Sequence, residues 1–229
     1  MDRLAAVLLL TAGVLAAAGC GGSGSRSNPG RGAKGSILVA ALGDSITAGS
    51  PGYDPSHARG KLLGFGSNVE SQWEYWAARK HPRLRFRNCG VYGERTDEIA
   101  RRLAACAHGA QALVVQGGIV DIAQGRPVAA AARNLRRMVE RGKELGLRVA
   151  VADVPPWNNE YPYAADRIRR LNGLIARLAR AEHVPVLPFY RTLDDPERPG
   201  RMPGAWTVDG DNPSVAGYRR LGELAFRLP

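Results

Sequence analysis

Residues 37–47 read ILVAALGDSIT, a continuous apolar run that ends in a Gly-Asp-Ser turn. Such a run is typical of a parallel strand that is buried on both faces. A serine directly after the strand lies at the edge of the sheet, and its own N–H begins the next helix. That geometry suits a nucleophile with a built-in donor for an oxyanion. The structural alternative is that Asp44 and Ser45 only cap the helix.

Strands and helices alternate along the rest of the chain. We expect strands at residues 37–42, 84–88, 112–116, 147–154 and 184–187. We expect helices at residues 68–80, 96–106, 127–145, 164–182 and 213–228, with Thr96 as the N-cap of the second. Repeated alternation predicts a parallel sheet with helices on both faces. Ligands bind beyond the carboxyl ends of the strands in such sheets.

Three further blocks accompany the Gly-Asp-Ser turn. Residues 88–93 read NCGVYG, residues 118–121 read GIVD, and residues 209–214 read DGDNPS. In this order the four blocks resemble those of the SGNH (GDSL-type) serine hydrolase family. The resemblance implies a three-layer α/β/α sandwich over residues 36–229, with a five-stranded parallel sheet of the flavodoxin-like kind. It also implies ester hydrolysis, as in esterases, lipases, lysophospholipases and carbohydrate O-acetylesterases.

The resemblance carries roles onto individual residues. Ser45 matches the nucleophile, and its N–H and that of Gly90 would hold the oxyanion. Asp209 matches the aspartate that orients the catalytic base. A small-molecule ester, lipid or glycan is the implied ligand, and no cofactor is expected.

Two positions depart from the family pattern. Val120 stands where the family has an asparagine that donates to the oxyanion, and loss of one such donor costs about 3 kcal/mol of transition-state stabilisation. Asn212 stands where the family has the histidine that takes the proton of the serine. An amide is no base at neutral pH, so we expect catalysis to be impaired or absent.

Other residues could replace the missing histidine or contact a ligand. His57, in the Gly- and Pro-rich segment 48–66 that is long enough to roof a site, is the candidate for a relocated base. His81, His108 and His183 are expected at the surface. Trp157 could stack on a sugar ring and Asn158 could hydrogen-bond its hydroxyls; the alternative for Trp157 is packing in a Pro-rich turn.

The N-terminus has the pattern of an export signal. Arg3 precedes an apolar stretch at residues 4–18, which is shorter than the roughly 20 residues of a membrane span. It resembles a bacterial lipoprotein signal over residues 1–19, which implies lipidation of Cys20. Residues 20–35 are rich in Gly and Ser and predict a flexible tether. We therefore expect a membrane-anchored protein of the cell envelope, facing outside the cytoplasm, with simple secretion as the alternative.

The net charge and the cysteines give weaker indications of function than the four sequence blocks do. The net charge is +11, and a basic surface could meet anionic lipid, acidic glycan or nucleic acid. No nucleic-acid motif accompanies the charge, so we expect solvated helix faces and no nucleic-acid partner. Cys89 and Cys106 could form a disulfide outside the cytoplasm, but we expect two buried free thiols. No metal-binding spacing of Cys and His occurs in the sequence, and no metal is expected.

Three hypotheses for function remain. The first is an envelope lipoprotein that binds an acylated lipid or glycan and turns it over slowly or not at all. The second is a working serine esterase with a rearranged base, either His57 or an aspartate of raised pKa. The third is a non-catalytic scaffold that uses the fold for protein contacts. We favour the first, because the losses at positions 120 and 212 occur together.

Overall fold

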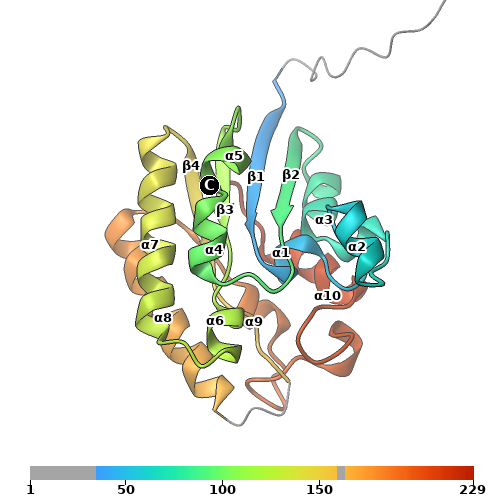
Figure 1. The fold of residues 1–229 in the computed structure, drawn as a ribbon. Coiled ribbons are helices and arrows are strands. Elements are labelled where there is room, and N and C mark those ends of the chain that lie inside the picture. The colour runs from blue at the N-terminus through green and yellow to red at the C-terminus, as the bar shows by residue number, and fades with distance from the viewer. Residues whose placement is uncertain (1–34, 159–162) are drawn as a thin grey trace, which may run out of the picture. The chain divides into compact units, whose positions relative to one another are not determined.

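The computed structural model describes residues 35–158 and 163–229 (Figure 1). The predicted signal peptide, Cys20 and nearly all of the predicted tether lie outside these residues. The strands are β1 (Ile37–Gly43), β2 (Leu84–Gly90), β3 (Ala112–Val115), β4 (Arg148–Ala152) and β5 (Val186–Leu187). The α-helices are α1 (Ser45–Ala48), α2 (His57–Leu62), α3 (Trp73–Lys80), α4 (Thr96–Arg101), α5 (Leu103–Ala107), α6 (Ile119–Ala123), α7 (Val128–Glu144), α8 (Ala164–Glu182), α9 (Phe189–Leu193) and α10 (Val215–Arg220). Two 3-10 turns, η1 (Val69–Ser71) and η2 (Gly204–Trp206), and a π-helical turn, η3 (Leu221–Ala225), complete the elements.

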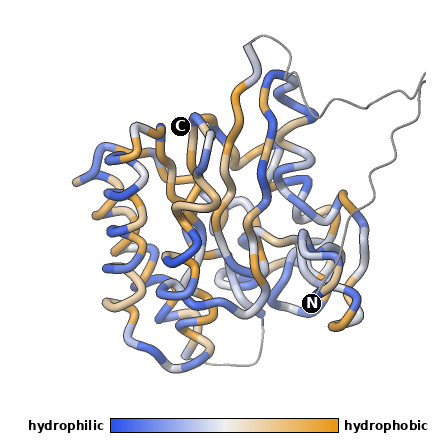
Figure 2. Tube along the Cα trace, turned by 45° about the horizontal axis from the view of Figure 1, so that its top comes forward, coloured by the Kyte–Doolittle hydropathy of each residue, from blue (hydrophilic) through white to orange (hydrophobic). Residues whose placement is uncertain are grey.

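The strands form one parallel sheet in the order β2-β1-β3-β4-β5. Alternate residues of each central strand point to opposite faces, which gives two apolar cores. Ala40 and Leu42 of β1 belong to the core under α4–α8, whereas Val39 and Ala41 belong to the core under α3, α9, α10 and η3. Hydrophobic residues accordingly run along the central strands (Figure 2). The predicted three-layer α/β/α fold with five parallel strands is confirmed.

Several expected helices are shorter or interrupted. Residues 68–80 divide at Gln72, whose backbone is extended, into η1 and α3. The helix expected at 96–106 breaks at Arg102 into α4 and α5. Thr96 is wrong as an N-cap: Arg95 occupies that position, and the Thr96 hydroxyl instead donates to Asp121. The last helix ends as the π-helical turn η3.

The expectation of two free thiols is also wrong. Cys89, at the end of β2, forms a disulfide with Cys106 of α5, with a Cα–Cα distance of 6.0 Å. The sequence could not settle this point, because pairing depends on how close the two Cβ atoms lie in space. The disulfide fixes the turn after β2 against α5.

Within the described residues, no helix combines the length and apolar character needed to cross a bilayer.

Candidate active site at the carboxyl edge of the sheet

The turn after β1 places Ser45 as the first residue of α1. The Ile46 N–H donates to Asp44 Oδ1 at 2.9 Å, so Asp44 is the N-cap. Ser45 is 8% exposed, and its hydroxyl forms no hydrogen bond with any described residue. Its N–H, at the first position of the helix, has no partner within that helix. The turn therefore offers both an oxygen nucleophile and a backbone donor.

Two glycines allow this turn to close. A Cβ on Gly43 would lie 2.2 Å from Thr47 Oγ1 and 2.5 Å from Gln116 Oε1, and one on Gly90 would lie 2.0 Å from the Ala48 N. Gln116, at the end of β3, accepts from the Thr47 hydroxyl at 2.8 Å and from the Asp44 N–H at 3.3 Å. The ends of β1, β2 and β3 therefore hold α1 in place from three sides.

Ser45 lines a cavity of about 470 Å³ at the carboxyl edge of the sheet. Its wall is mostly apolar, and its polar side chains come from the start of α1, the turn after β2, the end of α6 and the segment 209–212. The lining residues are Ser45, Ile46, Pro51, Phe65, Tyr92, Gly93, Ile119, Val120, Ala123, Gln124, Trp157, Asp209, Asp211 and Asn212. The structure thus brings Ser45, Val120, Trp157, Asp209 and Asn212 together, as the sequence predicted.

Asn212, which stands where the sequence resemblance expects the base, is held by Asp209. The Asn212 Nδ2 donates to Asp209 Oδ2 at 2.8 Å, and its backbone N–H donates to Asp209 Oδ1 at 2.7 Å. A carboxylate only accepts hydrogen bonds, so this contact fixes which end of the amide faces Asp209. The other end, Oδ1, is buried without a hydrogen-bond partner among the described residues. An amide oxygen accepts a hydrogen bond but does not take up the proton at neutral pH, so Asn212 cannot act as a general base.

The oxyanion side of the site differs from expectation at one glycine. The Gly90 N–H donates to Asn88 Oδ1 at 2.8 Å, and Gly90 does not line the cavity. Gly93, three residues later in the same turn, lines the cavity with φ of +77°. Its N–H has no partner among the described residues. Gly93 is therefore the better placed donor, and the signal that could have found it is the second glycine of NCGVYG.

Two other predicted contacts lie elsewhere. His57 begins α2, is exposed, contacts Tyr53 edge-on at 6.3 Å between ring centroids and does not line the cavity. The side chain of Asn158 is bound at both ends to the backbone of Met202, so it closes a loop and does not face a ligand. Among the described residues, no histidine lines the cavity.

Sequence reasoning missed several wall residues. Phe65 and Tyr92 lie edge-to-face at 5.1 Å between ring centroids, and Phe65 comes from the segment that was expected to roof the site. Ile119 and Gln124 enter the wall because α6 begins directly after β3. A short helix after Gly117-Gly118 carries no periodicity that would predict it.

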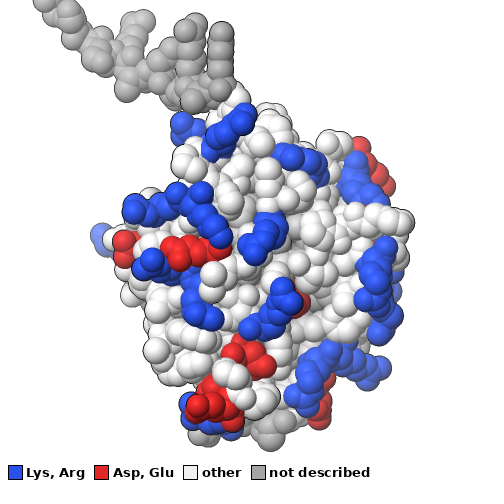
Figure 3. Space-filling view, turned by 180° about the vertical axis from the view of Figure 1, so that it is seen from behind, with Lys and Arg blue, Asp and Glu red and all other residues white. Residues whose placement is uncertain are grey.

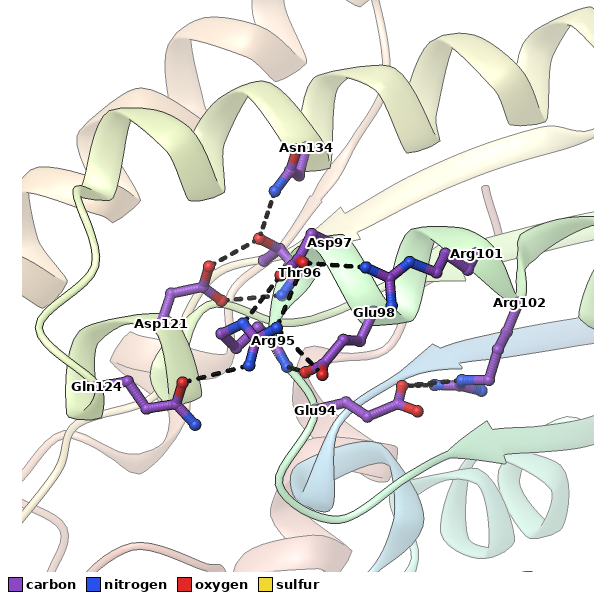
Figure 4. A network of polar contacts seen from close by, with 10 residues as sticks. All are labelled: Glu94, Arg95, Thr96, Asp97, Glu98, Arg101, Arg102, Asp121, Gln124 and Asn134. Atoms are coloured by element: carbon purple, nitrogen blue, oxygen red, sulfur yellow. Dashed lines mark hydrogen bonds and ion pairs between the residues drawn. The ribbon is translucent and has the colours of Figure 1, made fainter.

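A polar network braces the wall from behind (Figure 4). Asp121 of α6 accepts from the Thr96 N–H and the Thr96 hydroxyl, each at 2.9 Å, and Asn134 of α7 donates to the same hydroxyl. These bonds tie α4, α6 and α7 together and fix the turn that carries Val120. Arg102 pairs with Glu94 at 2.6 Å and donates to the Gly43 carbonyl, which fixes the turn after β2 against β1.

Burial raises the pKa of two aspartates near the site. The pKa of Asp44 rises to about 6 and that of Asp153 to about 7, in both cases chiefly because of desolvation. Neither residue lines the cavity with Ser45. The described residues contain no group of three or more His, Cys, Asp or Glu side chains placed to hold a metal ion.

The sequence and the fold of this chain both match one family of known proteins. The family model of the GDSL-like lipase/acylhydrolase family matches residues 41–220. A G-D-S-L family protein of Desulfitobacterium hafniense is similar in structure, with a TM-score of 0.67, 20% identity and coverage of 82% of this chain and 96% of that one. The lipase/acylhydrolase of Enterococcus faecalis has a TM-score of 0.62 and 22% identity, with coverage of 81% and 91%. No curated protein matches the sequence.

The raised pKa of Asp44 predicts a pH-dependent loss of stability. Its folded-state pKa of about 6 lies above the ordinary value of 3.8, so the folded protein binds this proton more tightly. The stabilisation of the folded state by the protonated Asp44 carboxyl is complete at low pH, and it is lost as the pH rises through about 6. Relative to Asp44→Asn, the wild type should lose about 2 kcal/mol of unfolding free energy between pH 4 and pH 7. Urea unfolding at both pH values measures it.

The matched control is Asp166→Asn, an exposed carboxylate at the start of α8. The difference between this variant and the wild type should stay nearly constant over the same range. If Asp44→Asn follows the pH dependence of the wild type, the carboxyl is not perturbed as described.

Proposed function

The chain belongs to the GDSL-like lipase/acylhydrolase family, and from that membership we propose that it is a cell-envelope lipoprotein that binds an acylated lipid or glycan ligand and turns esters over slowly or not at all. The supporting observation is the surroundings of Ser45. The serine is presented in a ligand-sized cavity, and the residue at the position of its base is an amide bonded to Asp209.

The chemistry at Ser45 requires a base, and among the described residues no histidine lines the cavity to act as one. A serine hydroxyl attacks a carbonyl well only when a base removes its proton as the bond forms. In a serine protease, loss of the histidine lowers kcat by about a millionfold. Val120 adds a second deficit, because its branched apolar side chain stands in the wall where an oxyanion donor would be.

Binding is a separate matter from turnover. The cavity has a volume of about 470 Å³ and a mostly apolar wall that includes Phe65, Tyr92 and Trp157. Aromatic faces of this kind pack against acyl chains or sugar rings. The backbone N–H groups of Ser45 and Gly93 remain to receive a carbonyl oxygen.

One observation favours a second candidate, an active esterase with a rearranged base. The carboxylates of Asp209 and Asp211 line the same cavity as Ser45. A carboxylate is a weaker base than an imidazole at neutral pH. This candidate therefore predicts turnover that is slow and lost in Asp209→Asn or Asp211→Asn. A scaffold role, the third candidate, predicts neither ligand binding nor turnover.

An ester assay separates these candidates. With a short-chain p-nitrophenyl ester, the wild type should hydrolyse at a rate within about tenfold of Ser45→Ala, because no base activates the hydroxyl. The double variant Val120→Asn/Asn212→His should gain at least about 100-fold, since it restores a base and a donor. Asn212→His alone should gain more than Val120→Asn alone.

The matched control is Val120→Asn/Asn212→Gln, which adds the donor and enlarges the side chain at 212 without a base. It should stay at the level of the wild type. Wild-type turnover far above background that vanishes in Ser45→Ala would contradict the proposal.

The lipoprotein assignment has its own test. Cys20 follows Ala17-Ala18-Gly19 after an apolar stretch, and lipidation needs the thiol of that cysteine. When the full chain is expressed in a bacterial host, it should fractionate with membranes and incorporate labelled fatty acid. Cys20→Ala should lose the label and leave the membrane fraction after a high-salt wash. A labelled Cys20→Ala chain would contradict the assignment.

A further inference from the structure

The two edges of the sheet differ in their acidic residues, because cations occur at both edges but aspartates gather at one. The aspartates of the described residues lie toward the carboxyl ends of the strands, in the turns and helix starts around the cavity. Arg and Lys predominate at the opposite edge, where strands begin and helices end. In Figure 3, a group of red side chains lies at the lower end of the domain, whereas blue side chains are spread from its upper end to its lower end. Sequence alone could not show this separation, because the charges alternate along the chain.

We call the strand-start edge the basic edge. Its cations include Arg79, Lys80, Arg83, Arg85, Arg141, Lys143, Arg148 and Arg180, and its acids include Glu144, Glu182 and Glu223. Arg141 pairs with Glu144, and Lys143 with Glu182. No ion pair within the described residues neutralises Lys80, Arg83 or Arg85. Helix ends favour cations through the helix dipole, but the dipole does not explain Arg83 and Arg85, which lie at the start of β2.

Exposed leucines lie among these cations. Leu145 follows α7, while Leu224 and Leu228 lie in and after η3, and all three are exposed. A recess of about 400 Å³ is lined by Ile37, Lys80, His81, Pro82, Arg83, Leu84 and Leu228. Cations with aliphatic side chains between them match the boundary between lipid headgroups and acyl chains, where basic residues meet phosphate and apolar ones insert.

The described chain also begins at this edge. Arg83 donates to the carbonyl of Gly35, the first described residue, and β1 follows from Ile37. The segment that leads back to Cys20 therefore joins the domain on the same side as the unpaired cations.

We propose that the basic edge docks on an anionic phospholipid bilayer, with Lys80 and Arg83 meeting the phosphate headgroups beside the mostly apolar recess. The cavity at Ser45 lies at the opposite edge of the sheet and faces away from that bilayer. The ligand of the cavity then reaches it from the aqueous side.

Vesicle binding tests the proposal without lipidation or catalysis. The probe is the chain from residue 20 onward carrying Cys20→Ser, which retains both apolar cores. It should co-sediment with phosphatidylcholine vesicles that contain phosphatidylglycerol and bind pure phosphatidylcholine at least about tenfold more weakly. Binding should fall steeply as salt is raised.

Charge reversal locates the surface. Lys80→Glu/Arg83→Glu should weaken binding by about tenfold or more, since each basic residue near an anionic surface contributes separately. Arg126→Glu/Arg201→Glu changes the net charge equally at exposed positions toward the cavity edge and should bind nearly as the wild type does. Thermal unfolding of each variant shows whether it is folded; if the first pair unfolds, Arg85→Glu/Leu228→Ser takes its place.

An environment-sensitive fluorophore reports which edge of the domain contacts the vesicle. Attached to Leu228→Cys it should shift to the blue on vesicles, whereas attached to Val208→Cys, beside Asp209, it should not. Equal loss of binding in the two charge-reversal pairs, a shift at Val208 instead of Leu228, or binding to duplex DNA without binding to anionic vesicles would each overturn the proposal. None of these outcomes depends on turnover at Ser45. The ester assay therefore tests the proposed function independently of vesicle binding.

Discussion

The close approach of three strand ends to α1 is the constraint on which the site depends. Gly43 and Gly90 have no side chain where a Cβ would collide with Thr47 or with the backbone of Ala48, and Gln116 accepts hydrogen bonds from both sides of the turn. Because the turn can close, α1 begins at Ser45 and its hydroxyl reaches the cavity. The disulfide of Cys89 and the bond from Arg102 to the Gly43 carbonyl hold the neighbouring turn. This turn lies within residues 41–220, which the model of the GDSL-like lipase/acylhydrolase family matches.

The side chains around Ser45 determine whether its hydroxyl can be activated. Asp209 keeps its role of holding the side chain three residues later, but that side chain is an amide, which cannot carry a proton from Ser45 to a leaving group. On the other side of the cavity, Val120 is held in place by the Asp121 network although it has nothing to donate. Packing and backbone geometry shape the cavity around Ser45, and among the described residues no histidine lines it.

The sequence predicted the parallel sheet and the two longest helices because hydrophobic periodicity reports burial directly. It predicted that Ser45, Val120, Asp209 and Asn212 would meet, since the carboxyl ends of parallel strands share one edge. It failed where contacts between distant residues decide. Gly90 and Gly93 look alike in sequence, and only the bond from Gly90 to Asn88 tells them apart. Asn158 looked like a ligand contact until its amide was seen on Met202. Pairing of Cys89 with Cys106, and the gathering of aspartates at one edge, likewise depend on tertiary structure.

The central claim is that the hydroxyl of Ser45 is accessible but not activated. A fluorophosphonate probe measures this directly, because it reacts with a serine whose proton is being removed and hardly at all with an ordinary one. Mass spectrometry of the treated protein gives the fraction of Ser45 that carries the phosphonyl group. The account predicts no measurable labelling of the wild type and labelling of Asn212→His at the same position. Rapid, stoichiometric labelling of Ser45 in the wild type would contradict it.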